Sequence, residues 1–321
     1  MAYTFMSIST EGSSIPRRSF LQAATWCLGV SVFDLDRTKE LQSGTEDLVK
    51  TFDEIRVNLL QLINEERAVE KVPPLSVDKL ATHVATAHAL DMATGKFASH
   101  WGRDGLKPYQ RYSLAGGIDA TQENISAADN TWSGKMKDLM QDTAYLHIRL
   151  YGEKPPNDGH RRAILASQHT HVGFGLALDQ LRLRLVEVFV AKYVELTPVR
   201  REAKAGDTFT FAGKLLRPNH VLKQVEVFYE PLPKAPESSW LAVPRPYSLP
   251  DDSVVLLPKL PLGVTYGDRT TGVVEVGSDG RFAVPVALFR RTPGIYTIVC
   301  WIKRNRSEKA FPATEVCIRA E

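Results

Sequence analysis

The spacing of apolar residues changes once along this chain, near residue 200, and the change limits the folds that the chain can adopt. Before residue 195, apolar residues recur three and four positions apart over long stretches, as in amphipathic helices, and alternate only near the end of this part. After residue 207 the helical spacing disappears, and short alternating segments separated by turn residues follow. At 321 residues the chain is long enough for two domains. We therefore predict an α+β architecture in which a mixed domain precedes an all-β domain.

The first domain is expected at residues 37–196. Its helices are expected over Thr45–Val69, from Ser76 as N-cap to Gly95 as C-terminal cap, over Trp132–Tyr151, and after the pair Pro155-Pro156. Alternating apolar residues on both sides of Asp179-Gln180 predict a β-hairpin. Helices around a small antiparallel sheet predict a three-layer α/β/α sandwich.

The second domain is expected at residues 208–321, after a charged linker at residues 197–207. Strands are expected at Thr208–Phe211, Val221–Tyr229, Val273–Val276, Phe282–Leu288, Tyr296–Ile302 and Thr314–Ile318. This pattern predicts a β-sandwich of immunoglobulin-like size. Residues 231–261 hold eight of the nineteen prolines, which predicts an irregular surface excursion or an extended arm.

Three cysteines are too few for a disulfide scaffold. Cys300 and Cys317 lie equally far from the polar turn around Arg306-Ser307-Glu308-Lys309, so a hairpin centred there would place them opposite each other. A strained cross-strand disulfide and two buried free thiols are both compatible with this spacing.

The first 36 residues have the pattern of an export signal. Arg17-Arg18 precede the apolar stretch from Ala23 to Phe33, which is too short to span a bilayer. This order resembles a twin-arginine signal, which would direct the protein to the periplasm or the exterior. The small-residue cleavage pattern is poor, so retention of the segment as a short anchor is an alternative.

The charge and hydropathy of the chain exclude some partners. The net charge is only +3, without a long basic run, so nucleic acid is not an expected partner. No run of eighteen apolar residues is present, so no transmembrane span is expected.

One histidine is predicted at the start of a helix. Pro156-Asn157-Asp158-Gly159-His160-Arg161-Arg162 combines a proline stop with Asn157 or Asp158 as N-cap. The helix dipole disfavours an imidazolium in the first turn, so His160 is biased towards the neutral form that accepts a proton or binds a metal. His160 could also simply pack beneath a loop. His83 and His88 are expected to be structural, and His169 and His171 to be exposed.

Six short motifs carry a resemblance to a known family. They are Asn64-Glu65-Glu66-Arg67, Pro74-Leu75, Phe97-Ala98-Ser99-His100, Glu123-Asn124, Gly159-His160-Arg161 and Val172-Gly173-Phe174-Gly175. In their order and approximate spacing the chain resembles the bacterial branch of the CAP superfamily, which comprises cysteine-rich secretory proteins, antigen 5 and pathogenesis-related 1. The C-terminal third lies outside this resemblance.

The resemblance implies a shallow cleft with two histidines and two acids. By motif these are His100, Glu123 and His160, whereas His147 stands where the family usually has its second glutamate, between Tyr145 and Tyr151. If His100, Glu123, His147 and His160 converge, they suit Zn²⁺ or a similar divalent cation. With three ligands and a bound water, Glu123 could instead act as a general base. The alternative is a polar cleft that holds no metal, with Asn124 bracing its strand.

Three functions are compatible with these features. The first is an exported binding module without catalytic activity, which we favour over an enzyme. Its cleft would bind a metal and a small or lipid-like ligand, and its β domain would associate with the envelope or an envelope polymer. The second is a metal-dependent hydrolase of peptide or cell-wall bonds with Glu123 as base. The third is a non-catalytic structural envelope protein. We rank the binding module first, the structural protein next and the hydrolase last, because the sequence shows no oxyanion donor or substrate clamp.

Overall fold

The computed structural model describes residues 35–129, 136–304 and 309–321, without the side chains of residues 35–46 and Met136. The predicted twin-arginine signal at residues 1–36 therefore lies almost entirely outside the described residues. The chain divides into two compact units, residues 1–54 and Ile55–Glu321, and the second unit holds both the sheet of the mixed domain and the β domain. Within the described part, no helix is long and apolar enough to cross a membrane.

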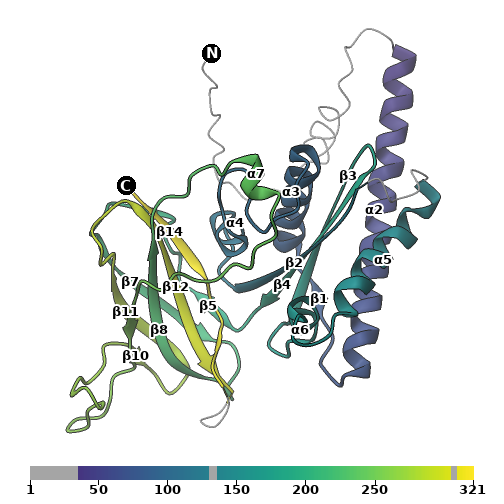
Figure 1. Cartoon of the computed structure of the whole chain (residues 1–321). Helices are drawn as coiled ribbons and strands as arrows, with labels where there is room; N and C mark the ends of the chain where they lie inside the picture. Colours follow the sequence, from purple (N-terminus) through teal and green to yellow (C-terminus); the bar gives the residue numbers. More distant parts are fainter. Residues whose placement is uncertain (1–34, 130–135, 305–308) are drawn as a thin grey trace. The chain divides into compact units, whose positions relative to one another are not determined.

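The mixed domain is a three-layer sandwich around a four-stranded sheet, as predicted (Figure 1). The sheet order is β1 (Ser76–Val77), β3 (His171–Asp179), β4 (Arg182–Ala191) and β2 (Ala120–Asp129), so β2 lies at one edge. Helix α3 (Lys79–Gly95) covers one face, where its alanines pack on Val186, Val188 and Val190 of β4. Helices α5 (Leu139–Tyr151) and α6 (Gly159–Leu165) contact the sheet from the other side.

The helix boundaries differ from the prediction at several places. Helix α2 (Leu35–Val69) begins before Thr45. Ser76 does not cap α3, because it belongs to β1 and pairs with His171, while the Asp78 carboxylate accepts from Ala81 N at 2.6 Å. The left-handed residue after α3 is Lys96, at φ 59°, and not Gly95. The third expected helix begins with a 3₁₀ turn (Met136–Asp138) before α5, and residues 130–135 are outside the described part.

Two glycines set the distance between α3 and the sheet. A Cβ on Gly173 would lie 2.1 Å from Thr82 N, and one on Gly175 would lie 2.1 Å from the backbone of Ala85. Only a hydrogen atom fits at such a distance, so the close packing of α3 on β3 requires both glycines of the Val172-Gly173-Phe174-Gly175 motif. The hairpin predicted across Asp179-Gln180 is present, with Gln180 at φ 52°.

The C-terminal part forms two packed sheets, as predicted. One contains β10 (Glu275–Val276), β11 (Arg281–Ala287), β7 (Thr208–Leu215) and β5 (Val194–Leu196). The other contains β6 (Glu202–Ala203), β14 (Val316–Ala320), β12 (Gly294–Lys303), β8 (Val221–Glu230) and β9 (Ser253–Leu256), with β13 (Phe311–Pro312) on β12. Phe211, Val284 and Ile298 are buried between them. Residues 197–207, predicted as a linker, contribute β6, which pairs with β14.

The two C-terminal cysteines are not opposite each other. Cys317 of β14 pairs with Thr297 of β12, whereas Cys300 lies three residues further along β12. Successive strand residues point to opposite faces, so the two thiols lie on different faces of the sheet. Both are free and buried, and burial raises the pKa of each thiol to about 12. The disulfide alternative is therefore wrong, because the register of β12 with β13 and β14 does not bring Cys317 opposite Cys300.

Two segments connect the mixed domain to the β domain. Helix α4 (Pro108–Leu114) contacts β14, and the Tyr109 hydroxyl and the Gln110 amide both donate to Glu230 of β8, at 2.6 and 2.8 Å. Between β8 and β9, residues 231–252 form an irregular segment with one short helix, α7 (Ser238–Leu241). We call residues 231–252 the proline-rich arm. The excursion predicted over residues 231–261 is irregular up to residue 252, whereas Ser253–Leu256 form strand β9, which pairs with β8.

Candidate ligand-binding cleft

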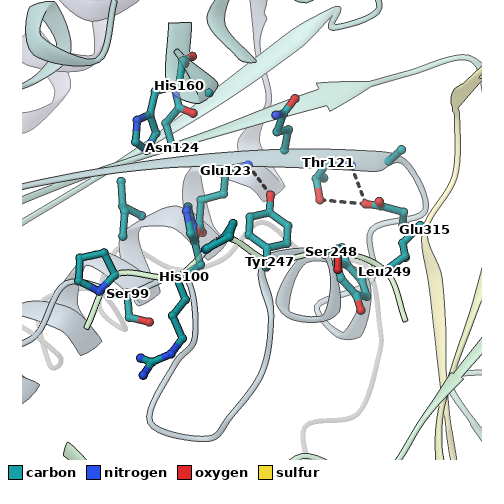
Figure 2. Close-up of a pocket in the computed structure, with 18 of the residues that line it drawn as sticks. Ser99, His100, Thr121, Glu123, Asn124, His160, Tyr247, Ser248, Leu249 and Glu315 are labelled. Carbon is teal, nitrogen blue, oxygen red and sulfur yellow. Dashed lines mark hydrogen bonds and ion pairs between the residues drawn. The ribbon is translucent and has the colours of Figure 1, made fainter. Parts of the chain in front are cut away.

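A cavity of about 770 Å³ lies along strand β2. Its walls come from the loop before α4, from the start of α6, from the proline-rich arm and from the β domain (Figure 2). More apolar than polar surface lines it. Three of the four residues predicted by motif, His100, Glu123 and His160, line this one cavity.

His100 is held by Glu123. Its Nδ1 lies 2.9 Å from Glu123 Oε1, and because an ionised carboxylate only accepts, Nδ1–H is the donor. This fixes the tautomer and leaves Nε2 for other partners. In the described part of the chain, His100 Nε2 has no hydrogen-bond partner.

Glu123 is a buried carboxylate whose charge is compensated on several sides. Burial alone would raise its pKa, but Arg111, whose Nη2 donates at 2.7 Å, and the neighbouring histidines lower the pKa to about 2. A general base needs a pKa near the working pH, so a carboxylate of this kind is a weak proton acceptor. The geometry makes Glu123 the group that orients His100.

His88 also lies beside Glu123, although no local sequence pattern places it there. Its Nε2 lies 2.8 Å from Ser99 O and 3.9 Å from Glu123 Oε1. Burial lowers its pKa to about 4, and the nearby Arg111 cation adds to this. His88 is therefore neutral and fully packed, as the structural interpretation predicted.

His160 has a carboxylate partner of its own, Glu153. Nδ1 of His160 lies 2.5 Å from Glu153 Oε1, and the backbone N–H of His160 donates to Glu153 Oε2 at 3.0 Å. Asp158 occupies the N-cap position of α6 as predicted, but its side chain makes no capping bond. Glu153 therefore both caps helix α6 and orients the His160 imidazole. The Nε2 of His160 has no partner among the described residues.

The fourth predicted residue, His147, lies elsewhere. It is fully buried in α5, with Nδ1 at 2.6 Å from Glu187 and Nε2 at 2.9 Å from Glu66. Burial alone would lower its pKa, but the two carboxylates outweigh burial and raise the pKa to about 10. His147 is thus a buried imidazolium between two glutamates, and it does not line the cavity.

The four-ligand metal set expected from the sequence does not converge. Both nitrogens of His147 are engaged with carboxylates, so neither is open to a metal ion in this arrangement. Among the described residues no three His, Cys, Asp or Glu side chains are placed to hold a metal ion. His100 and His160 do have the carboxylate-bound Nδ1 that is common in metal-binding histidines, but each lacks the further protein ligands.

Two β-domain residues complete the cavity. The arm inserts Tyr247, whose hydroxyl accepts from Glu123 N at 2.8 Å and whose ring contacts that of His100 with centroids 4.8 Å apart. Next to it, the Glu315 carboxylate accepts from Thr121 N at 2.8 Å (Figure 2). Burial raises the pKa of Glu315 to about 8. The β domain is therefore part of this cleft and does not merely follow it in sequence.

Asn124 braces the strand, as expected. Its amide nitrogen lies 3.2 Å from His160 O and 3.2 Å from Glu187 Oε2, so it connects β2, α6 and β4. His169, expected to be exposed, is instead buried, with Nδ1 at 2.9 Å from Ala163 O and its ring stacked on Phe189. Exposure was predicted because no acid stands beside His169 in the sequence. That prediction was wrong, since a backbone carbonyl serves as the partner of the buried ring.

Sequence reasoning missed Glu153, Tyr247 and Glu315. Glu153 carries a local signal, since it stands seven residues before His160 across a proline turn that brings the chain back. Tyr247 and Glu315 carry none, because they are 124 and 194 residues from their partners on β2.

Comparison with known proteins agrees with this fold. Residues 60–193 match the model of the cysteine-rich secretory protein (CAP) family. No curated protein matches the chain. The mixed domain is an α/β/α sandwich with a cleft, its residues 60–193 match the CAP family model, and a β domain follows.

Three solved structures are similar to part of the chain. An extracellular SCP-domain protein from Bacillus anthracis is 21% identical, with a TM-score of 0.33, over 51% of this chain and 45% of that one. An outer surface protein from Borrelia burgdorferi is 16% identical, with a TM-score of 0.34, over 43% and 92%. A cysteine-rich secretory protein from Staphylococcus aureus is 15% identical, with a TM-score of 0.29, over 44% and 39%. The match therefore spans less than half of the Bacillus anthracis chain.

Proposed function

We propose that this chain is an exported CAP-type binding module whose cleft takes up a small or lipid-like ligand. One observation carries the proposal: two imidazoles, His100 and His160, each held at Nδ1 by a carboxylate, line one largely apolar cavity of about 770 Å³. Cavities of this size with apolar walls and a few oriented polar groups suit small organic ligands. The imidazoles would hold the polar end of the ligand, and the apolar walls its body.

The electrostatics of Glu123 favour binding over hydrolysis. A hydrolase with Glu123 as base would need this carboxylate free to take a proton, whereas both of its oxygens are engaged by His100 and Arg111. The binding module therefore ranks above the hydrolase. The scaffold alternative makes no use of the oriented imidazoles.

A lipid extraction tests the binding proposal. The full-length protein is purified, extracted with organic solvent and analysed by mass spectrometry, beside the His100→Ala and His160→Ala variants. We expect co-purifying ligand that is lost from both variants and kept in His83→Ala, which changes an exposed residue of α3. Equal recovery from all four proteins would contradict a role for the cleft.

Zinc binding by the cleft stays a prediction, and it is tested separately. Among the described residues His100 and His160 offer only two open imidazole nitrogens, so an ion bound here would need water or the organic ligand as further donors. Uptake of one equivalent of Zn²⁺ that His160→Ala abolishes, with the circular dichroism unchanged, would support it. Equal uptake by this variant would remove it.

The β domain is proposed to associate with the cell envelope in addition to closing the cleft. The loop between β9 and β10 supports this part of the proposal: in it Leu262 is fully exposed and Val264 is 47% exposed, while the Tyr266 hydroxyl donates to Pro258 O at 2.7 Å. Exposed apolar side chains of this kind favour a partner surface. Co-sedimentation with envelope fragments should fall in Leu262→Asp, and unchanged co-sedimentation would count against this surface.

A further inference from the structure

The outer edge of β2 presents unpaired backbone groups to the cleft. Within the sheet β2 pairs only with β4. The backbone N–H groups of Thr121 and Glu123 donate to Glu315 and Tyr247, which are outside the sheet. Hydrogen-bonding groups alternate in direction along an antiparallel strand, so the N–H and C=O groups of Ile125 and Ala127 point the same way. In the described part of the chain, the N–H of neither residue makes a hydrogen bond to a group outside the sheet.

The β domain covers this edge in steps. Where the strand begins, Ala120 N donates to Ala313 O and Glu315 N donates to Ile118 O, both at 3.2 Å, around an isolated antiparallel bridge between Asp119 and Thr314. The next two outward positions are satisfied by side chains, Glu315 and Tyr247. The cavity continues along β2 beyond them as far as Ala127. The edge is thus already used for backbone pairing at one end and is open at the other.

The proline-rich arm lies along the cavity but cannot pair with this open part. Pro244 and Pro246 line the cavity, and neither has a backbone N–H to donate. The side chain of Arg245, between them, is held on the Trp240 ring at 4.3 Å and bonds to Trp240 O. The arm therefore forms a wall of the cavity and leaves the edge available to another chain.

We propose that the cleft binds an extended peptide segment, which adds a strand to the outer edge of β2 beside Ile125 and Ala127. Strand addition to an exposed edge supplies affinity through backbone hydrogen bonds and specificity through alternate side chains. The side chains of β2 alternate between the two faces, since Glu123 contacts His100 on the α3 side while Asn124 contacts α6 on the other. Alternate side chains of the peptide reach the His100 side and the His160 side in turn.

This inference rests on the proposed function, since it names the ligand class of the same cleft. It favours a peptide with small or apolar side chains, because Ala98, Pro244 and Ala127 are among the cavity walls. A small molecule without backbone amides would occupy the same cavity without using the edge.

The Ala127→Pro substitution tests the edge directly. It removes the outward N–H of residue 127 but leaves the bonds to β4, which are made by the neighbouring positions, so the sheet is retained. The matched control is Ala127→Val, which adds bulk at the same place and keeps the N–H. The probe is a fluorescein-labelled hexapeptide of alternating valine and threonine, and binding to the full chain is followed by fluorescence anisotropy.

We expect the probe to bind the unchanged protein and Ala127→Val similarly, and to bind Ala127→Pro at least about tenfold more weakly. An analogue N-methylated at alternate amides should bind as weakly as the proline variant. Equal binding of the probe by Ala127→Pro, equal binding of the N-methylated analogue, or no binding of the probe to the unchanged protein would overturn the inference. Retention of co-purifying lipid in Ala127→Pro would leave the binding function standing, so the two proposals fail separately.

Hydrogen exchange gives a second measurement that does not depend on the proline variant. The amide of Ala127 should exchange rapidly in the free protein, whereas Ser126, which faces β4, should be protected. Added probe should slow exchange at Ala127. Protection of Ala127 in the free protein would contradict an open edge.

Discussion

Glu123 illustrates how a single residue can be essential to a site without being its reactive group. Its pKa of about 2 in the folded protein lies below the ordinary value of 4.5, so the stability that it contributes is present above about pH 4.5 and is lost as the pH falls towards 2. Glu123→Gln leaves Arg111 buried without a countercharge. We expect this variant to lose about 3 kcal/mol of unfolding free energy at pH 7, measured by urea denaturation.

The matched control for Glu123→Gln is Asp91→Asn, which removes the carboxylate of an exposed ion pair with Arg103. Exposed pairs contribute little, so this variant should lose less than about 1 kcal/mol. Equal losses of unfolding free energy in the two variants would mean that the Glu123 carboxylate is not a buried charge.

His147 should make stability depend on alkaline pH. Its pKa of about 10 in the folded protein is above the ordinary 6.5, so its contribution is complete below pH 6.5 and is lost as the pH rises towards 10. The difference in unfolding free energy between the unchanged protein and His147→Gln should therefore shrink across this range. Urea denaturation at several pH values measures it, with His83→Gln as control. A constant difference would indicate that the buried ring is neutral.

Part of the cleft could be predicted from the sequence, because each of its motifs is formed by residues adjacent in the chain. His100, Glu123, Asn124 and His160 were placed by short sequence patterns, and all four line the cavity. The same reasoning predicted His147 in the cleft, whereas it is buried between Glu66 and Glu187. The sequence could not show that these two glutamates enclose it. A pattern identifies a position on a helix, whereas the partners of a side chain come from other elements.

Helix α3 and strand β3 pack so closely that glycine is required between them. Gly175→Ala would place a Cβ 2.1 Å from the backbone of Ala85, so the helix has to move away from the sheet. We expect a loss of about 3 kcal/mol or more in unfolding free energy, from thermal or urea denaturation. Gly159→Ala is the control, because no atom lies within 4 Å of its added Cβ. Comparable stability of the two variants would contradict this packing.

Element types were largely predictable, and their ends were not. Apolar spacing identified the helices and strands because each element buries one face. The N-cap of α3 was missed because Ser76 and Asp78 both have suitable side chains, and the choice between them depends on β1 pairing with β3. The cysteine register was missed for a similar reason, since the pairing of β12 with β13 and β14 is decided by the packing of the whole sheet.

At the scale of the whole second unit, Glu315 should make the association of the two domains pH-dependent. Its pKa is raised by burial to about 8, so the folded protein favours the protonated form and loses stability as the pH rises from 4.5 through 8. Glu315→Gln removes this loss and keeps an oxygen that can accept from Thr121. We expect this variant to be more stable than the unchanged protein at pH 9, measured by thermal denaturation, with little difference at pH 5. A variant less stable at pH 9 would mean that the ionised carboxylate is the favoured form.

The β domain supplies part of the cleft. Tyr247 and Glu315 satisfy backbone groups of β2 and form walls of the cavity, so this cleft differs from one bounded by residues 60–193 alone. No local pattern could predict this, because the residues that meet are 124 and 194 positions apart in the sequence.

Histidine NMR of the full chain tests the central claim most directly, namely that His100 and His160 share one ligand cleft and His147 does not. With ¹⁵N-labelled histidine, the ring signals are followed while a lipid extract or the alternating hexapeptide is added. We predict that the Nε2 signals of His100 and His160 shift together at the same ligand concentration, while the signals of the enclosed His147 stay in place. Shifts at His147 with none at His100 and His160, or saturation of these two at different concentrations, would contradict the claim.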